Sequence, residues 1–201
     1  GSWIVDLMKI LVLTSLFAGL LAFQNAASRY FYAMGRAGVM PSNLASTNSS
    51  GAPQQASLVT SLITGAVIVI FAAAGLDPYT KLFSWMSGIS VIAIVVVEIL
   101  VSVAVLRYFN TQTGSNVWKT KVAPIVSIVL LLISLYLLMA RFNLLAGTVP
   151  PNVDPSLPES AWKLSALGWF LVLVPFIALV IGYVVATVSK KNHASLSKDF
   201  A

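Results

Sequence analysis

Long apolar runs separated by short polar segments dominate the pattern of the chain. A helix needs about 20 consecutive apolar residues to cross a bilayer, and five runs are long enough. Their connections are rich in Gly, Pro, Ser and Asn, which end helices. The pattern therefore predicts an all-α integral membrane protein, a single membrane unit over 1–201, with five transmembrane helices at approximately 3–34, 56–74, 79–106, 122–142 and 162–188.

The composition agrees with a membrane protein and argues against a soluble one. Hydrophobic residues make up 58% of the chain and charged residues only 9%, whereas a soluble domain carries about 25% charged residues. The net charge of +6 falls between apolar runs without forming a basic stripe, so nucleic acid is not an expected partner. There is no cysteine, paired-carboxylate site or metal-spaced cluster in the sequence. We therefore expect no enzyme activity, no metal and no cofactor.

The distribution of basic residues predicts an orientation. Cytoplasmic flanks of membrane spans collect Lys and Arg. Eight of the 12 basic residues lie on alternate flanks, namely Arg29, Arg36, Arg107, Lys119, Lys121, Lys190, Lys191 and Lys198. We therefore expect these flanks and the tail 189–201 to be cytoplasmic and the N-terminus of the chain to be outside. An odd number of spans that begins outside predicts that earlier helices precede this chain.

One motif, within residues 22–41, carries a family resemblance. There an apolar helix continues into an amphipathic end and stops at a Gly-x-x-Pro turn. The spacing R-x-x-x-A-M-x-R-x-G-x-x-P is formed by Arg29, Ala33, Met34, Arg36, Gly38 and Pro41. It resembles the end of the eighth transmembrane helix and the following loop of amino acid–polyamine–organocation (APC) permeases. Ala37 departs from the family pattern, which usually has an acidic residue there.

This resemblance implies a fold and a function for the chain. The five spans would be helices eight to twelve, the C-terminal portion of an inverted-repeat transporter fold built from five plus five helices. The function implied is that of a secondary active transporter moving amino acids or related amines across the plasma membrane. Its partners would be the lipid bilayer, the missing N-terminal helices of the same transporter and the small-molecule substrate. The last two spans form dimers in some relatives, so a homodimer is also expected.

The first span contains the candidate substrate-binding residues. Gly19, Phe23, Ala26 and Ala27 recur at helical spacing and form one face, called the substrate stripe below. The resemblance places Phe23 where substrate often binds. Its ring would offer a cation–π surface to an ammonium group. The alternative is that Phe23 packs against protein or faces lipid.

The same span bears on the coupling ion. Sodium-coupled relatives use hydroxyl side chains one step before the substrate contact, at positions that correspond to Leu21 and Ala22. Neither side chain has an oxygen, and a hard cation requires oxygen ligands. We therefore expect sodium-independent transport that is proton-coupled or exchanging.

Several polar residues in the spans have two interpretations. Glu98 is either a proton carrier or substrate counter-charge or, as we prefer, a structural hydrogen-bonding group toward a neighbouring helix, with Ser102 at i+4 on the same face as its expected partner. Arg29 and Arg36 would anchor the helix end near lipid phosphates or form an inner-gate ion pair. The polar stripe of the first span (Gln24, Asn25 and Ser28) is expected to bond across helices or to meet cytoplasmic water.

Two other functions compete with transport at this stage. One is a non-transporting five-span scaffold or assembly subunit. The other is a channel, which the pattern disfavours because no span has a regular polar face or ring-forming charges. Upstream hydrophobic segments in the full gene would separate the transporter from the scaffold.

Overall fold

The structure is a computed structural model that describes residues 2–110 and 116–188. The expected cytoplasmic tail, 189–201, lies outside the described residues, with three of the basic residues used to predict the orientation. Most of the polar loop between the third and fourth spans lies outside them as well.

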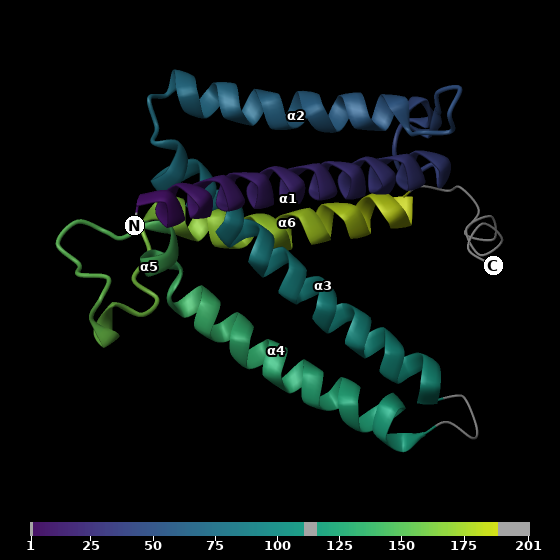
Figure 1. Ribbon diagram of the computed structural model, residues 1–201. Coiled ribbons are helices and arrows are strands. Elements are labelled where there is room, and N and C mark those ends of the chain that lie inside the picture. The colour runs from purple at the N-terminus through teal and green to yellow at the C-terminus, as the bar shows by residue number, and fades with distance from the viewer. Residues whose placement is uncertain (1, 111–115, 189–201) are drawn as a thin grey trace. The chain divides into compact units, whose positions relative to one another are not determined.

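Helices account for the regular structure of the described residues, among which no strand occurs. The α-helices are α1 (Ser2–Arg36), α2 (Gln54–Ala73), α3 (Ser84–Asn110), α4 (Ala123–Ala140), α5 (Phe142–Ala146) and α6 (Ala166–Val188) (Figure 1). All except α5 belong to helical segments long and apolar enough to cross a membrane. The predicted all-α membrane fold with five spanning helices is therefore confirmed.

Two of the spanning segments begin with a wider, π-helical turn. Pro78–Phe83 (η2) continues into α3, and Trp118–Val122 (η3) continues into α4. The first of these turns is capped by Asp77, whose Oδ1 accepts the amide N–H of Tyr79 at 3.0 Å and of Thr80 at 2.6 Å. Hydrogen bonds from the amide and then the hydroxyl of Thr80 are the main reason why the pKa of Asp77 lies below its ordinary value.

The chain divides into two compact units. The first unit comprises Gly1–Ile70 with Tyr183–Ala201, and the second comprises Phe71–Gly182. The first contains α1, a 3-10 turn η1 (Ser42–Ala45) and most of α2. The second contains α3, α4, α5 and most of α6.

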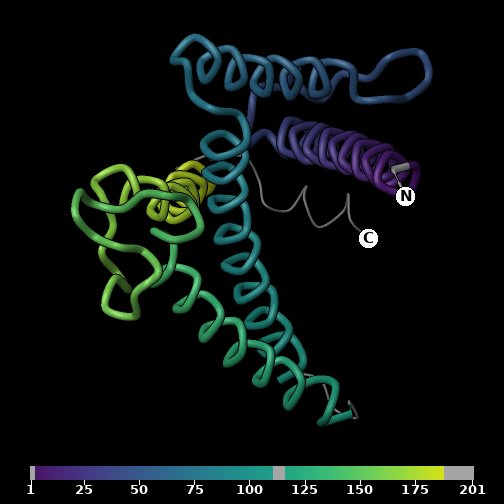
Figure 2. The backbone as a smooth tube through the Cα atoms, turned by 60° about the vertical axis from the view of Figure 1, so that its left-hand side comes forward, coloured from purple at the N-terminus to yellow at the C-terminus, as the bar shows by residue number. Residues whose placement is uncertain are grey.

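The second unit has an apolar core. Its α3 and α4 lie side by side as a hairpin that both views show (Figure 1, Figure 2). At the end of the hairpin near α5, the buried side chains of Ile92, Phe142, Ala146, Leu164, Leu171 and Val172 form one cluster. Gly88 allows the fully buried ring of Phe142 to approach α3, because a Cβ atom at Gly88 would lie 2.6 Å from Phe142 Cε2.

Residues 147–165, called the cap segment below, fold back onto the second unit. Their four prolines predict an extended loop, but the segment is held by side chains just before it. The Arg141 guanidinium donates to the carbonyl of Leu157 at 2.8 Å, to the carbonyl of Pro158 at 3.3 Å and to Ser160 Oγ at 3.1 Å. The Arg141 side chain therefore holds residues 157–160 of the cap segment in place by hydrogen bonds.

Asn143 provides a second, buried anchor for the cap segment. Its Nδ2 donates to the carbonyl of Ser160 at 2.7 Å and to that of Lys163 at 3.3 Å, while its Oδ1 accepts the N–H of Leu144. Asn143 is 0% exposed, so its bonds form away from solvent. A buried polar group is tolerated when its hydrogen-bonding capacity is used, as it is here.

Candidate functional site

The end of α1 explains two residues of the sequence motif. Gly38 has a φ of +70°, in the left-handed region that glycine adopts most readily. Its N–H donates to Gly35 O at 3.1 Å, and the N–H of Val39 donates to Met34 O at 3.0 Å. These two bonds are those of a Schellman motif, which ends a helix by satisfying its last carbonyls. Gly38 therefore stops α1, and Pro41 follows because it cannot continue a helix.

The chain then returns against α1 through η1. Pro41 precedes this turn, and the buried side chain of Leu44 lies against Gly35. A Cβ atom at Gly35 would lie 2.9 Å from Leu44 Cβ and 3.0 Å from the backbone N of Ala45. Sequence analysis missed the role of Gly35, since it requires knowing how the chain returns. The only available signal was a small residue inside the motif.

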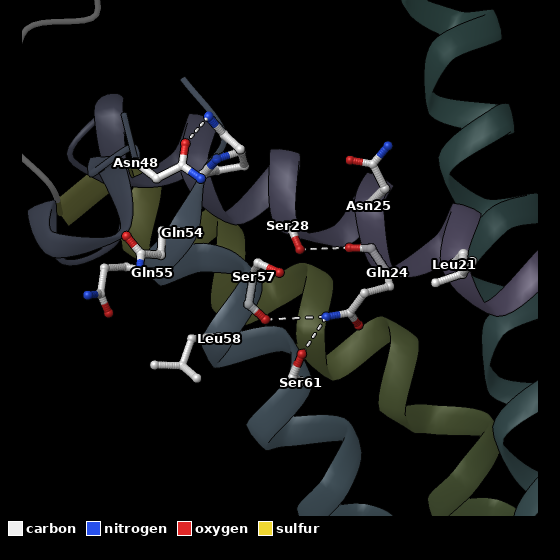
Figure 3. A pocket seen from close by; sticks show the side chains of 12 residues that line it. Leu21, Gln24, Asn25, Ser28, Asn48, Gln54, Gln55, Ser57, Leu58 and Ser61 are labelled. Atoms are coloured by element: carbon white, nitrogen blue, oxygen red, sulfur yellow. Dashed lines mark hydrogen bonds between the residues drawn. The ribbon is translucent and has the colours of Figure 1, made fainter. Parts of the chain in front are cut away.

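A polar pocket of about 620 Å³ lies within the first unit, beside residues 21–28 of α1 (Figure 3). Its walls come from α1, from the loop after η1 and from the first two turns of α2. The lining residues are Leu21, Gln24, Asn25, Ser28, Asn48, Ala52, Pro53, Gln54, Gln55, Ser57, Leu58 and Ser61.

Gln24 connects the two helical walls of the pocket. Its Nε2 donates to Ser61 Oγ at 2.8 Å and to Ser57 O at 3.3 Å (Figure 3). On α1 itself, the buried Ser28 hydroxyl donates to Gln24 O at 2.7 Å. The prediction that Gln24 bonds across helices is thus confirmed, and α1 and α2 are joined through amide and hydroxyl groups.

The loop wall is shaped by Asn48. Its Oδ1 accepts the N–H groups of Ser50 at 3.0 Å and of Ala52 at 2.8 Å, and its own N–H donates to Ala52 O. These bonds close the loop over five residues, with Gly51 at a φ of +77°. A polar side chain that mimics the backbone in this way stabilises a turn. The loop therefore has a defined shape where it borders the pocket.

The lining of the pocket contains no ionisable side chain. A neighbouring cavity of about 570 Å³ shares Asn25 and adds Arg29 and Tyr32, so positive charge lies to one side. Amide and hydroxyl groups can exchange hydrogen bonds with a neutral polar solute or with water. The pocket itself provides no group suited to proton transfer near neutral pH.

The substrate stripe lies on a different face of α1 from this pocket. With about 100° per residue, the lining residues of α1 lie roughly opposite the substrate stripe. Phe23 is 73% exposed, and no atom outside its own helix lies within 4 Å of a Cβ atom built at Gly19. The structure therefore places no described side chain against Gly19, and Ala26 is exposed while Ala27 is half-buried.

The other predicted residues are not brought together with this stripe. Glu98 is exposed on α3, and no hydrogen bond joins it to another described residue. Ser102, its expected partner, instead donates to Ser127 Oγ of α4 at 3.5 Å. Arg29 and Arg36 are both exposed near the end of α1. The roles predicted for these residues remain predictions.

Comparison with known proteins identifies the family. A family model described as amino acid permease matches residues 1–172, which include α1 to α5 and the beginning of α6. No curated protein and no solved structure matches the chain. The family match includes the motif at the end of α1 and confirms the resemblance to APC permeases. The chain therefore belongs to the amino acid permease family.

Proposed function

We propose that the chain is the C-terminal portion of a secondary active transporter that moves amino acids or related amines across the plasma membrane. Membership of the amino acid permease family supports transport and a multi-pass membrane location. The observation that carries the finer proposal is the division of α1 into two faces. One face is joined to α2 by hydrogen bonds, and the other is the substrate stripe.

The two faces suit different neighbours. The face that contacts α2 uses Gln24 to fix the distance and register between the two helices. The substrate stripe is made of Gly, Ala and one Phe, and such small side chains let a ligand or another helix approach the backbone closely. Phe23 adds an aromatic face that attracts an ammonium group by about 0.5–2 kcal/mol. In this proposal α1 is a fixed wall of the transport pathway.

We propose that transport does not depend on sodium and is proton-coupled or exchanging. Leu21 borders the polar pocket with an apolar side chain, and Ala22 has no side-chain oxygen. The nearest hydroxyl side chains earlier in α1 are those of Thr14 and Ser15, about two turns away, and the Thr14 hydroxyl donates to carbonyls of its own helix, Ile10 O and Leu11 O, each at 3.0 Å. A sodium site on this part of α1 would lack the oxygen ligands that a hard cation requires.

The proposed arrangement in the membrane follows from the charges. Arg29, Arg36 and the basic ends of α3 and η3 would lie in the cytoplasm, and the cap segment would lie outside. The chain would form one membrane unit with the N-terminal helices of the transporter, and α4 and α6 would provide a homodimer surface. Glu98 keeps its proposed structural role, a hydrogen bond to a neighbouring helix.

The division of α1 into two faces can be tested in the full-length transporter reconstituted in liposomes. Phe23→Ala should raise the KM for amino acid uptake about tenfold, because roughly 1.4 kcal/mol of ring contact would be lost. Phe17→Ala is the matched control, since Phe17 is 64% exposed and lies seven residues before Gln24 on the face toward α2. Equal effects of the two substitutions on KM would refute the assignment of the substrate stripe.

The coupling ion can be tested in the same liposomes. Replacing external sodium by choline at constant pH should leave the initial rate of amino acid uptake unchanged. A collapse of uptake in choline, restored by sodium, would show that oxygen ligands for the ion exist elsewhere and would contradict sodium independence.

A further inference from the structure

A positively charged cavity lies at the end of the α3–α4 hairpin that is remote from the apolar core. A cavity of about 330 Å³, called the hairpin-end pocket below, lies between the end of α3 and the start of α4. It is lined by Leu106, Arg107, Asn110, Lys121 and Ile125. All five residues belong to the second unit, so the pocket is defined by the hairpin alone.

The positive charge of this pocket is not neutralised by the hairpin. Arg107 and Lys121 are exposed, and no acidic described residue forms an ion pair with either of them. The sequence between Glu98 and Asp154 contains no Asp or Glu. A guanidinium and an ammonium group at one cavity favour an anion, and the fork of the guanidinium matches the oxygens of a phosphate.

The surroundings of the pocket match a membrane interface. The pocket lies at the ends of two membrane-spanning segments, Pro78–Asn110 and Trp118–Ala140. Trp118 is 73% exposed and Tyr108 is 62% exposed, as is typical of aromatic side chains at the level of lipid headgroups.

The apolar side of the pocket extends along the hairpin. Leu106 and Ile125 border the charged groups, and exposed Val103 and Val129 continue the apolar surface one turn further toward the middle of the spans. A ligand with a charged head and an acyl chain can use both surfaces, whereas a free phosphate ion can use only the charged one.

We propose that the hairpin-end pocket binds the phosphate of an anionic phospholipid. Arg107 and Lys121 pair with the phosphate oxygens, Asn110 donates a hydrogen bond to the headgroup, and an acyl chain lies along Leu106 and Ile125. Basic pockets between membrane helices bind anionic headgroups in this way. The proposal rests on the charges and the membrane location of the hairpin, and it is independent of the substrate stripe.

The test is native mass spectrometry of the full-length transporter in detergent, titrated with phosphatidylglycerol or with phosphatidylcholine. The parent protein should retain phosphatidylglycerol in preference to phosphatidylcholine. Removing both cations with Arg107→Gln and Lys121→Gln should weaken binding of phosphatidylglycerol on the order of 30-fold, since each cation near a lipid surface contributes a several-fold factor.

Two further variants separate charge at this pocket from total charge and from folding. Lys9→Gln with Lys163→Gln removes two exposed cations elsewhere and should leave the binding of phosphatidylglycerol unchanged. Arg107→Lys with Lys121→Arg keeps both charges and should restore most of the binding. If the double Gln variant does not fold, loss of binding in Arg107→Gln alone, with rescue by Arg107→Lys, tests the same prediction.

Three outcomes would overturn the proposal. Equal retention of the two lipids would mean that only the ordinary lipid shell is bound. Unchanged binding of phosphatidylglycerol in the double Gln variant would place the lipid elsewhere on the protein. Displacement of phosphatidylglycerol by millimolar inorganic phosphate would show that the pocket recognises a soluble anion without the acyl chain. None of these outcomes would affect the test of the substrate stripe.

Discussion

The two units associate their helices by different means. In the first unit the contacts of α1 are polar or small: Gln24 bonds to α2, Ser28 is buried, and Gly35 receives Leu44. In the second unit an aromatic ring, that of Phe142, is fully buried among aliphatic side chains of three helices and the cap segment.

This difference follows from the membrane as solvent. Lipid tails are as apolar as Leu, so an apolar helix gains little from burying its surface and associates through close packing and hydrogen bonds. The first unit uses such local contacts and leaves most of α1 exposed. The second unit builds a core where the chain leaves the spans, at α5 and the cap segment. Removing one contact in each unit tests whether the units depend on these different interactions.

The largest expected effect is in the core of the second unit. Phe142→Ala should lower the free energy of unfolding by about 3 kcal/mol, because a fully buried ring is replaced by a cavity. Thermal unfolding of the full-length transporter in detergent measures the loss. Phe23→Ala is the matched control, since its ring is 73% exposed and should change the unfolding temperature little. Similar losses from both substitutions would mean that α1 is also held by an apolar core.

The next effect is a matched pair of glycine substitutions on α1. Gly35→Ala should lower the free energy of unfolding by about 1–3 kcal/mol, because the new Cβ would meet Leu44 and the backbone of Ala45. Gly19→Ala should be neutral or stabilising by up to about 1 kcal/mol, because a Cβ has free space there and Ala favours a helix.

Hydrogen–deuterium exchange of residues 34–45 measures both glycine substitutions. Faster exchange is expected in the Gly35 variant only. Unchanged exchange in that variant would mean that η1 can move away from α1 without destabilising residues 34–45.

The smallest effect concerns the hydrogen bonds between α1 and α2. Gln24→Leu should lower the free energy of unfolding by about 0.6–1 kcal/mol, the usual contribution of a hydrogen bond between membrane helices. Asn25→Leu is the control, because Asn25 lines the same pocket but makes no described hydrogen bond to α2. Unfolding temperatures of the two variants compare them. A larger loss in Asn25→Leu would show that the pocket wall, and not the Gln24 bond, joins the helices.

The parts of the fold that could be predicted are those set by local composition. Apolar runs predict the five spanning helices because a bilayer imposes their length and polarity. The bond from Gln24 was predicted because a polar group in an apolar helix has few alternative roles.

The parts that could not be predicted depend on residues far apart in the chain. The prolines of residues 147–160 suggested an extended loop, but Arg141 and Asn143 bind carbonyls 16 to 20 residues later. Nothing local marks such acceptors, since every residue has a carbonyl. Ser102 was expected to pair with Glu98 on its own helix, yet it faces Ser127 on α4. The hydrophobic periodicity of a uniformly apolar helix does not predict which of its faces contacts the neighbouring helix.

The anchoring of the cap segment by Arg141 has a consequence for how the molecule responds to its medium. The carbonyl and hydroxyl oxygens that the guanidinium binds are neutral acceptors without an acidic proton to gain or lose near neutral pH. No carboxylate takes part, so neither acidification nor added salt removes a charge partner from the cation. The hydrogen bonds that hold the cap segment should therefore be insensitive to acid and to ionic strength, unlike contacts built from ion pairs.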